Sequence, residues 1–204
     1  MIINVEQGKY ILKEQWDTTD IYDIASSLTT PSYIGFWSAL HFHHLTNQVP
    51  QTIFVVTTKR KRSQTLQHQK ISFVTVKPNW FFAYERYYNM VVSDKEKTII
   101  DCLHVPAYAG GISHIYQALT SDLNIDTLIA YCQQTKSSTI ASRLGYLLDK
   151  KQLREIHTAQ LPLHVFEQDY IQALFLHTLF QTSDVFVFKG GTFLKHAYGL
   201  DRFS

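Results

Sequence analysis

Cysteine is scarce in this chain, with two residues, Cys102 and Cys132, among 204. Two thiols so far apart in the sequence give no support to a disulfide framework or to a zinc site. Each lies in an apolar stretch with helical spacing, where a free cysteine packs as a small hydrophobe. The scarcity favours a reducing cytoplasm as the compartment of this protein.

Long apolar runs, repeats and low-complexity segments are absent as well. No stretch approaches the ~18 uninterrupted apolar residues that a membrane span needs. The start at Met1 does not combine a basic segment with an apolar run, so neither export nor membrane insertion is expected. A formal charge of +2 excludes a strong overall field, so any contact with nucleic acid would need a local patch.

The chain does contain enough apolar material for a core, with 45% hydrophobic and 18% charged residues. Strand-like patterns cover residues 2–12, with a turn at Gly8, and residues 53–56, 71–76 and 80–92. Helical spacing covers residues 17–28, 32–45, 94–104, 112–119, 125–133 and 138–148, with Asp94 as a cap and a break at Gly110 and Gly111. We therefore predict an α+β fold, an antiparallel sheet with flanking helices.

A polar run from Asp149 onward and a proline at position 162 interrupt the apolar pattern. They predict a domain over residues 1–150, a linker over residues 151–163 and a separate segment over residues 164–204. This last segment is expected to add a partial nucleotidyltransferase-like strand, turn and helix to the fold.

The strand-turn-helix pattern lies in residues 185–204. A β-branched and aromatic run suits a buried strand, Gly190 and Gly191 permit a sharp turn, and Thr192 can cap the helix that follows. Backbone N–H groups at such a helix start attract phosphate, and Lys189 adds positive charge. A glycine pair before a helix more often forms an ordinary turn that binds no ligand, and that alternative stays open.

Three strings in this segment, EQDY (167–170), FVFKGGTFL (186–194) and YGLDRFS (198–204), have a specific order and spacing. They resemble the opening of the AbiEii/AbiGii-type nucleotidyltransferase family, the toxin half of a phage-defence toxin–antitoxin pair. In that family the last string leads into an acidic residue and an Asp-x-Asp pair that holds metal ions. The resemblance implies an incomplete phosphate-binding site made of Lys189, Gly190, Gly191, Thr192, Arg202 and Ser204.

The printed sequence ends at Ser204, before the position of those carboxylates. Divalent metal needs clustered carboxylate oxygens, so we expect the segment to bind nucleotide weakly and to turn over nothing. Asp201 precedes Arg202 and is expected in a loop or capping role. No catalytic residue and no cofactor are predicted in this chain, and magnesium with a nucleoside triphosphate is implied if residues elsewhere complete the site.

Three further strings, YIGFWSALHFHHLTNQVP (33–50), VVSDKEKTIIDCL (91–103) and SRLGYLL (142–148), span most of residues 1–150. They resemble the C-terminal domain of AbiEi-type antitoxins, the transcriptional regulators of the same defence pair. Such antitoxins usually begin with a winged helix-turn-helix, of which VEQGKYIL (5–12) resembles the last strand of the wing. The DNA-reading helix is therefore not expected here, and neither is sequence-specific operator binding.

The run Lys59, Arg60, Lys61 and Arg62 is the densest group of cations in the sequence. Four cations at a strand end could neutralise phosphates and bind nucleic acid without sequence preference. A solvated hairpin tip is the more ordinary interpretation, and an acidic protein partner is a third.

Several other groups have a functional and a structural interpretation. The histidines at 41, 43 and 44 could hold a metal, but they lack the three or four ligands at defined spacing that zinc requires, so no metal site is predicted. The aromatic run over residues 80–88 could stack single-stranded bases with Arg86 supplying charge, although strand aromatics usually form core pairs. The pairs Ser38 with His41 and Cys102 with His104 lack an orienting carboxylate, so neither is expected to be catalytic.

The leading hypothesis is therefore an antitoxin and regulator of an AbiE-type toxin–antitoxin system that acts by protein contact, and by transcriptional regulation as a further role, without catalysis. Its expected partner is the cognate nucleotidyltransferase toxin, with the DNA backbone and a second copy of the chain as further candidates. The alternative is a nucleotidyltransferase toxin-family protein that transfers a nucleotide with magnesium.

Overall fold

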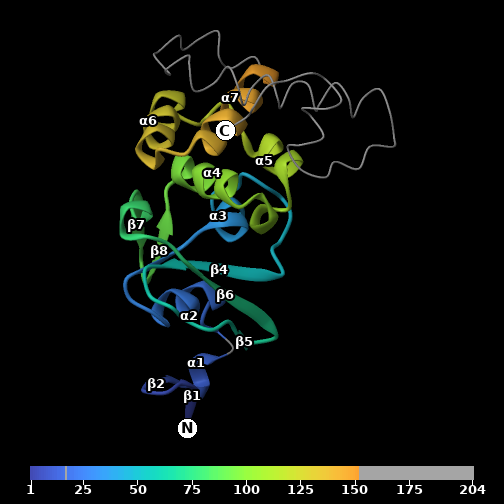
Figure 1. Cartoon of the computed structure of the whole chain (residues 1–204). Helices are drawn as coiled ribbons and strands as arrows, with labels where there is room; N and C mark the ends of the chain where they lie inside the picture. Colours follow the sequence, from blue (N-terminus) through green and yellow to red (C-terminus); the bar gives the residue numbers. More distant parts are fainter. Residues whose placement is uncertain (17, 152–204) are drawn as a thin grey trace, which may run out of the picture.

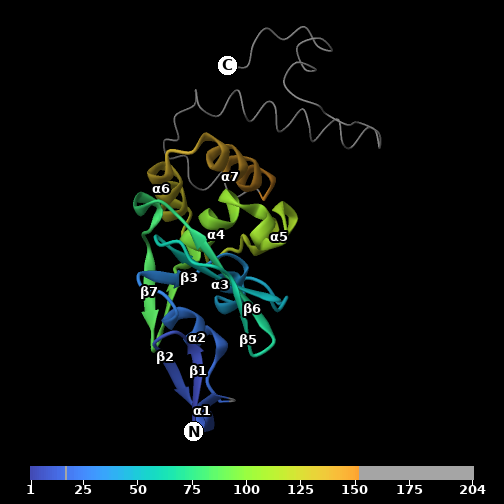
Figure 2. The ribbon, with the colours of Figure 1, turned by 60° about the horizontal axis from the view of Figure 1, so that its bottom comes forward.

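The computed structural model describes residues 1–16 and 18–151. These residues form layers: a two-stranded hairpin, a short helix, a six-stranded sheet and a group of helices on the far side of the sheet (Figure 1). Within the described residues, the hairpin lies at the opposite end from the helices at 125–135 and 138–150 in both views (Figure 2).

The N-terminal part consists of the following elements: β1 (Ile2–Glu6), β2 (Lys9–Leu12), α1 (Lys13–Trp16) and α2 (Ile21–Ser27). The sheet and its connections consist of β3 (Ser32–Ile34), α3 (Phe36–Phe42), β4 (Thr52–Thr57), β5 (Gln64–Leu66), β6 (Gln69–Thr75), η1 (Pro78–Trp80), β7 (Tyr84–Tyr87) and β8 (Met90–Ser93). The helical part consists of α4 (Lys95–His104), η2 (Pro106–Ala109), α5 (Ile112–Ala118), α6 (Ile125–Thr135) and α7 (Ser138–Lys150).

The predicted α+β class is confirmed, but the large sheet is mixed. Its strand order is β5-β6-β4-β3-β8-β7, and the β4–β6 and β3–β8 pairs are parallel. The expected antiparallel pairing holds for β1–β2, β3–β4, β5–β6 and β7–β8. The prediction missed the parallel pairs because the alternation of a strand shows which face is buried, and partner choice depends on residues far away in sequence.

The sheet has an apolar core on each face. Along β4, Ile53 and Val55 pack in the cluster that contains Ala25 and Leu28 of α2 and its neighbourhood. Val56 belongs to the larger cluster formed with α3 to α7. A central strand that is covered on both faces reads as a continuous apolar run, as β4 does.

Helix boundaries follow local chemistry where the sequence contains caps. The Asp94 side chain accepts a hydrogen bond from the Lys97 N–H at 2.6 Å, which confirms the predicted start of α4. Gly110 and Gly111 have φ values of +76° and +97° and separate η2 from α5, as predicted.

The helix predicted over residues 32–45 is wrong at its start. Residues 32–34 form β3, whose side chains are all buried, and α3 begins at Phe36. Gly35 lies between them with its N–H donating to the Phe54 carbonyl at 3.0 Å. The apolar spacing of this string fits both the helical period and the strand period. Pairing with β4 and β8 makes its first residues a strand.

The cysteines behave as expected for small apolar side chains. Cys102 in α4 and Cys132 in α6 are both buried and free. Burial raises the pKa of the Cys132 thiol to about 11 and that of Cys102 well above its ordinary value. No helix in the described ranges has the length and apolar character needed to cross a membrane.

Candidate functional site

The cationic run lies in the loop that joins β4 to β5. Because β4 and β6 are parallel and β5 lies outside β6, this loop crosses the end of β6. The Thr75 hydroxyl at the end of β6 donates to the Lys59 carbonyl at 3.4 Å, and the Lys59 N–H donates to Thr57 Oγ1 at 3.2 Å. The hairpin-tip interpretation is therefore wrong, since β4 and β5 are not neighbours in the sheet.

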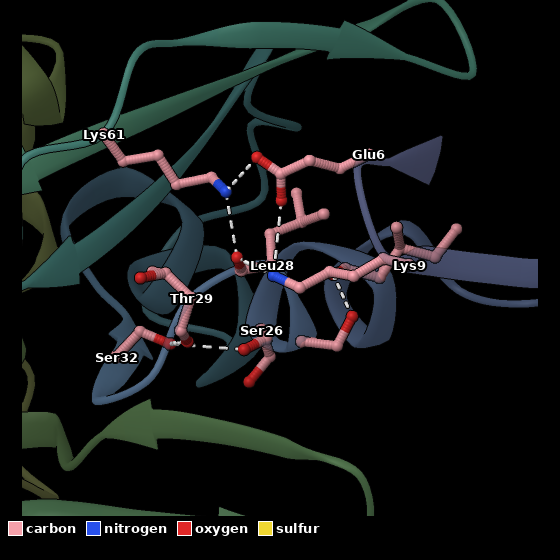
Figure 3. Close-up of polar contacts among 9 residues, drawn as sticks. Glu6, Lys9, Ser26, Leu28, Thr29, Ser32 and Lys61 are labelled. Carbon is pink, nitrogen blue, oxygen red and sulfur yellow. Dashed lines mark hydrogen bonds and ion pairs between the residues drawn. The ribbon is translucent and has the colours of Figure 1, made fainter. Parts of the chain in front are cut away.

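Three of the four cations are exposed and one is anchored. Lys59, Arg60 and Arg62 are exposed. The side chain of Lys61 is 15% exposed; its ammonium pairs with Glu6 and donates to the Leu28 carbonyl at 2.9 Å (Figure 3). Lys61 therefore does not belong to the free cationic surface predicted from the sequence.

Lys61 ties this loop to the N-terminal hairpin. Glu6 of β1 accepts from both Lys61 and Lys9, the latter at 3.3 Å, and Lys9 also donates to the Leu28 carbonyl (Figure 3). The hydrogen bond from Lys61 is the main cause that lowers the pKa of the Glu6 carboxyl. Two ammonium groups thus meet one carboxylate and one carbonyl where β1, α2 and the loop come together.

A wider segregation of charge surrounds the loop. Residues 24–84 contain no aspartate or glutamate, but they contain six cations: Lys59, Arg60, Lys61, Arg62, Lys70 and Lys77. Thr57 and Thr75 are opposite each other in the parallel β4–β6 pair, so Lys59 and Lys77 follow at the same end of the sheet. The cationic end is defined here by its four exposed members, Lys59, Arg60, Arg62 and Lys77.

A buried polar cluster lies on the helical side of the sheet. Lys97 of α4 forms an ion pair with Asp101 one turn later and donates to the Tyr33 hydroxyl at 3.1 Å. Tyr33 in turn donates to Asp101 at 2.9 Å. Burial raises the pKa of the Asp101 carboxyl more than Lys97 and Tyr33 lower it. With both charged side chains sealed from solvent, the cluster is a structural element of the core.

Two of the three strings at residues 33–50, 91–103 and 142–148 supply this cluster, and the third contacts the same helix, α4. The first string supplies Tyr33, and the second supplies Lys97 and Asp101. The third supplies Arg143, whose guanidinium donates to the Leu103 carbonyl at 2.5 Å near the end of α4. These strings therefore determine core packing. Sequence reasoning missed the cluster, although a lysine four residues before an aspartate on one helix was a signal for the ion pair.

Among the three histidines at 41, 43 and 44, the side chain of His43 has a structural role. The His43 Nε2 lies 2.6 Å from the Ser93 carbonyl, and burial lowers the pKa of this imidazole. No group of three metal-ligating side chains is found in the part of the chain that the structure describes.

The two nucleophile pairs weighed from the sequence have other partners. Ser38 Oγ donates to the Thr52 carbonyl at 3.2 Å and accepts from the Phe54 N–H at 2.9 Å, so it links α3 to β4. The thiol of Cys102 is buried, and the ring of His104 packs on Trp80 with 4.3 Å between centroids.

The aromatic run over residues 80–88 divides between core and surface. Tyr84 stacks on Tyr33 with 5.6 Å between ring centroids and contacts Phe81 at 4.9 Å, as expected for core pairs. Tyr84 is nevertheless 43% exposed and Tyr88 96% exposed. Exposed aromatic surface therefore lies at the β7 edge of the sheet.

The predicted phosphate-binding residues, Lys189, Gly190, Gly191, Thr192, Arg202 and Ser204, lie outside the described residues. The linker, apart from its first residue, and the C-terminal segment lie outside them as well. No protein-family model matches the chain, and no curated protein matches it.

Proposed function

We propose that the chain is an antitoxin and regulator of an AbiE-type toxin–antitoxin pair and that it works by binding. The resemblance of the three strings to AbiEi-type antitoxins supports this proposal. Tyr33 and Lys97 of the first two strings are hydrogen-bonded, and Leu144 of the third string lies in the same apolar core as Tyr33. Its protein partner would be the cognate nucleotidyltransferase toxin. Its work in the cytoplasm would need no cofactor in this chain.

We further propose that the regulator contacts the DNA backbone through the cationic end of the sheet. The observation that carries this proposal is the exposure of Lys59, Arg60 and Arg62 on a loop that Lys61 anchors to Glu6. Phosphate contacts by lysine and arginine position a protein on a duplex without reading its sequence. An acidic protein would compete for the same surface.

The test is DNA binding by the full chain across a series of salt concentrations. The slope of log K against log salt is negative for such binding. Replacing Lys59, Arg60 and Arg62 together by glutamine should make it shallower by about 2.7, three times the ~0.9 expected for each phosphate contact. For wild-type protein those three contacts alone correspond to about a 40-fold loss of affinity between 50 and 200 mM salt.

The control is a triple variant with the same change in charge at exposed positions elsewhere, Lys13→Gln, Lys136→Gln and Lys150→Gln. It should keep the wild-type slope if the contacts are local. Equal losses in both triple variants would contradict a defined interface. Nucleotide transfer by the chain with magnesium would contradict the non-catalytic part of the proposal and favour the transferase alternative.

A further inference from the structure

A hollow of about 460 Å³ lies beside the end of α2, the loop that leads into β3, and the β7–β8 pair. Its size is within the range of small-molecule sites. None of its lining residues is acidic, so it offers no carboxylate to a cation. Its lining consists of hydroxyl groups, an arginine with an asparagine, aromatic rings and the aliphatic side chains of Pro31 and Val91.

The hydroxyl wall is held by its own hydrogen bonds. Ser32 Oγ donates to the Thr29 carbonyl at 2.6 Å and to the Ser26 carbonyl at 3.2 Å (Figure 3). The Ser26 hydroxyl accepts from the Val91 N–H at 3.1 Å, which leaves its own proton for a further acceptor. Thr30 adds a hydroxyl at an exposed position. This wall therefore offers one held donor, the Ser26 hydroxyl, with the exposed Thr30 hydroxyl near it.

The opposite wall comes from β7. Alternation along the strand places Tyr84 and Arg86 on one face and Glu85 on the other, where Glu85 accepts from the Tyr87 hydroxyl at 2.8 Å. Arg86 is exposed and lines the hollow, whereas Glu85 does not line it. The Tyr84 ring is held in place by its stack on Tyr33.

We propose that this hollow binds a nucleotide. Arg86 and the hydroxyls of Ser26 and Thr30 would donate to the phosphate, because a planar guanidinium and neutral O–H groups together suit an anionic oxygen cluster. The exposed part of the Tyr84 ring would stack against the base. An apolar ligand would leave the proton of the buried Ser26 hydroxyl without an acceptor, which disfavours such a ligand.

The ligand is either a free nucleotide or the terminal nucleotide of a single strand. The Thr57 hydroxyl donates to the carbonyl of Pro31, a lining residue, at 2.7 Å. Thr57 is also the last residue of β4, two positions before Lys59. A single strand that ends in the hollow could therefore continue toward the cationic end. The hollow uses different residues from that surface, so failure of one proposal leaves the other standing.

The experiment is calorimetric titration of the full chain with adenosine 5′-monophosphate and, separately, with a 5′-phosphorylated thymidine tetranucleotide. If the mononucleotide binds saturably, a free nucleotide is a sufficient ligand. If only the tetranucleotide binds saturably, the ligand is the end of a single strand. In either case Arg86→Gln should weaken binding roughly tenfold or more, from loss of charge-assisted hydrogen bonds. Lys136→Gln, with the same change in charge, should leave the affinity unchanged.

The base contact is tested by comparing adenosine monophosphate with inorganic phosphate. Stacking on Tyr84 should make the nucleotide bind about fivefold to 150-fold more tightly than phosphate. Tyr84→Leu should remove most of this difference, provided that the unfolding midpoint shows an intact fold. The proposal is overturned if neither nucleotide probe binds saturably. It is also overturned if Arg86→Gln and Lys136→Gln lose the same amount of nucleotide affinity.

Discussion

Replacing Lys97 by methionine should destabilise the fold by about 3–5 kcal/mol at neutral pH, the cost of breaking a buried ion pair by removing one partner. The Lys97 side chain is 0% exposed and that of Asp101 4% exposed, so water cannot replace the ammonium. Methionine preserves most of the volume, and the hydrogen bond from Tyr33 to the carboxylate remains. The loss therefore comes mainly from the uncompensated charge of Asp101.

The penalty should shrink as the pH falls. Burial already raises the pKa of Asp101 above its ordinary value with Lys97 present, and loss of the ammonium raises it further. A carboxyl whose pKa is higher in the folded state is destabilising at pH values above that pKa. Its cost is relieved as the pH falls through the folded value toward the unfolded one. The difference between wild type and Lys97→Met should therefore be largest at neutral pH and narrow in acid.

The double variant Lys97→Met with Asp101→Leu separates charge from packing. It removes both charges, and apolar replacement of a buried pair is often neutral or stabilising, so most of the lost stability should return. Urea unfolding followed by tryptophan fluorescence measures this, because Trp80 packs against the apolar core that contains Tyr33. A single variant within about 1 kcal/mol of wild type at neutral pH, or a double variant no more stable than the single, would refute the reasoning.

Two further predictions concern close packing and the N-terminal hairpin. Gly35→Ala should cost about 1–3 kcal/mol in urea unfolding, because the new Cβ would lie 2.8 Å from a Val56 methyl group. The cost should fall in a Val56→Ala background, and an unchanged unfolding midpoint for Gly35→Ala alone would contradict the prediction. Lys61→Gln should speed amide hydrogen exchange in residues 1–12, because the link from the loop to Glu6 and Leu28 is lost. Global stability should change by about 1 kcal/mol or less, and unchanged exchange would show that other contacts hold the hairpin.

Features that depend on neighbouring residues were predictable from the sequence. The start of α4 follows from Asp94, the break between η2 and α5 from Gly110 and Gly111, and the β1–β2 hairpin from the turn at Gly8. Each of these is decided within a few residues by backbone freedom or by a single capping hydrogen bond. Burial of the cysteines followed from the apolar character of their surroundings.

Features that depend on distant partners were not predictable in the same way. Tyr33 meets Lys97 across 64 residues, and Lys61 meets Glu6 across 55. The continuous apolar run of β4 indicated burial on both faces but did not identify its parallel partner β6, and that pairing places the cationic loop across the end of β6. The hollow beside Arg86 likewise brings together α2 and β7, which are far apart along the chain.

Lys97 is buried and Lys61 is half-buried, and the two ammonium groups have different roles. Lys97 is enclosed in the core, while Lys61 keeps its charge at the surface of the sheet but uses it on Glu6 and the Leu28 carbonyl. A loop that is already held loses less conformational freedom when its exposed cations contact a partner. In the proposed DNA contact, anchoring by Lys61 would add to the affinity without touching the ligand, because it fixes the place from which Lys59, Arg60 and Arg62 extend.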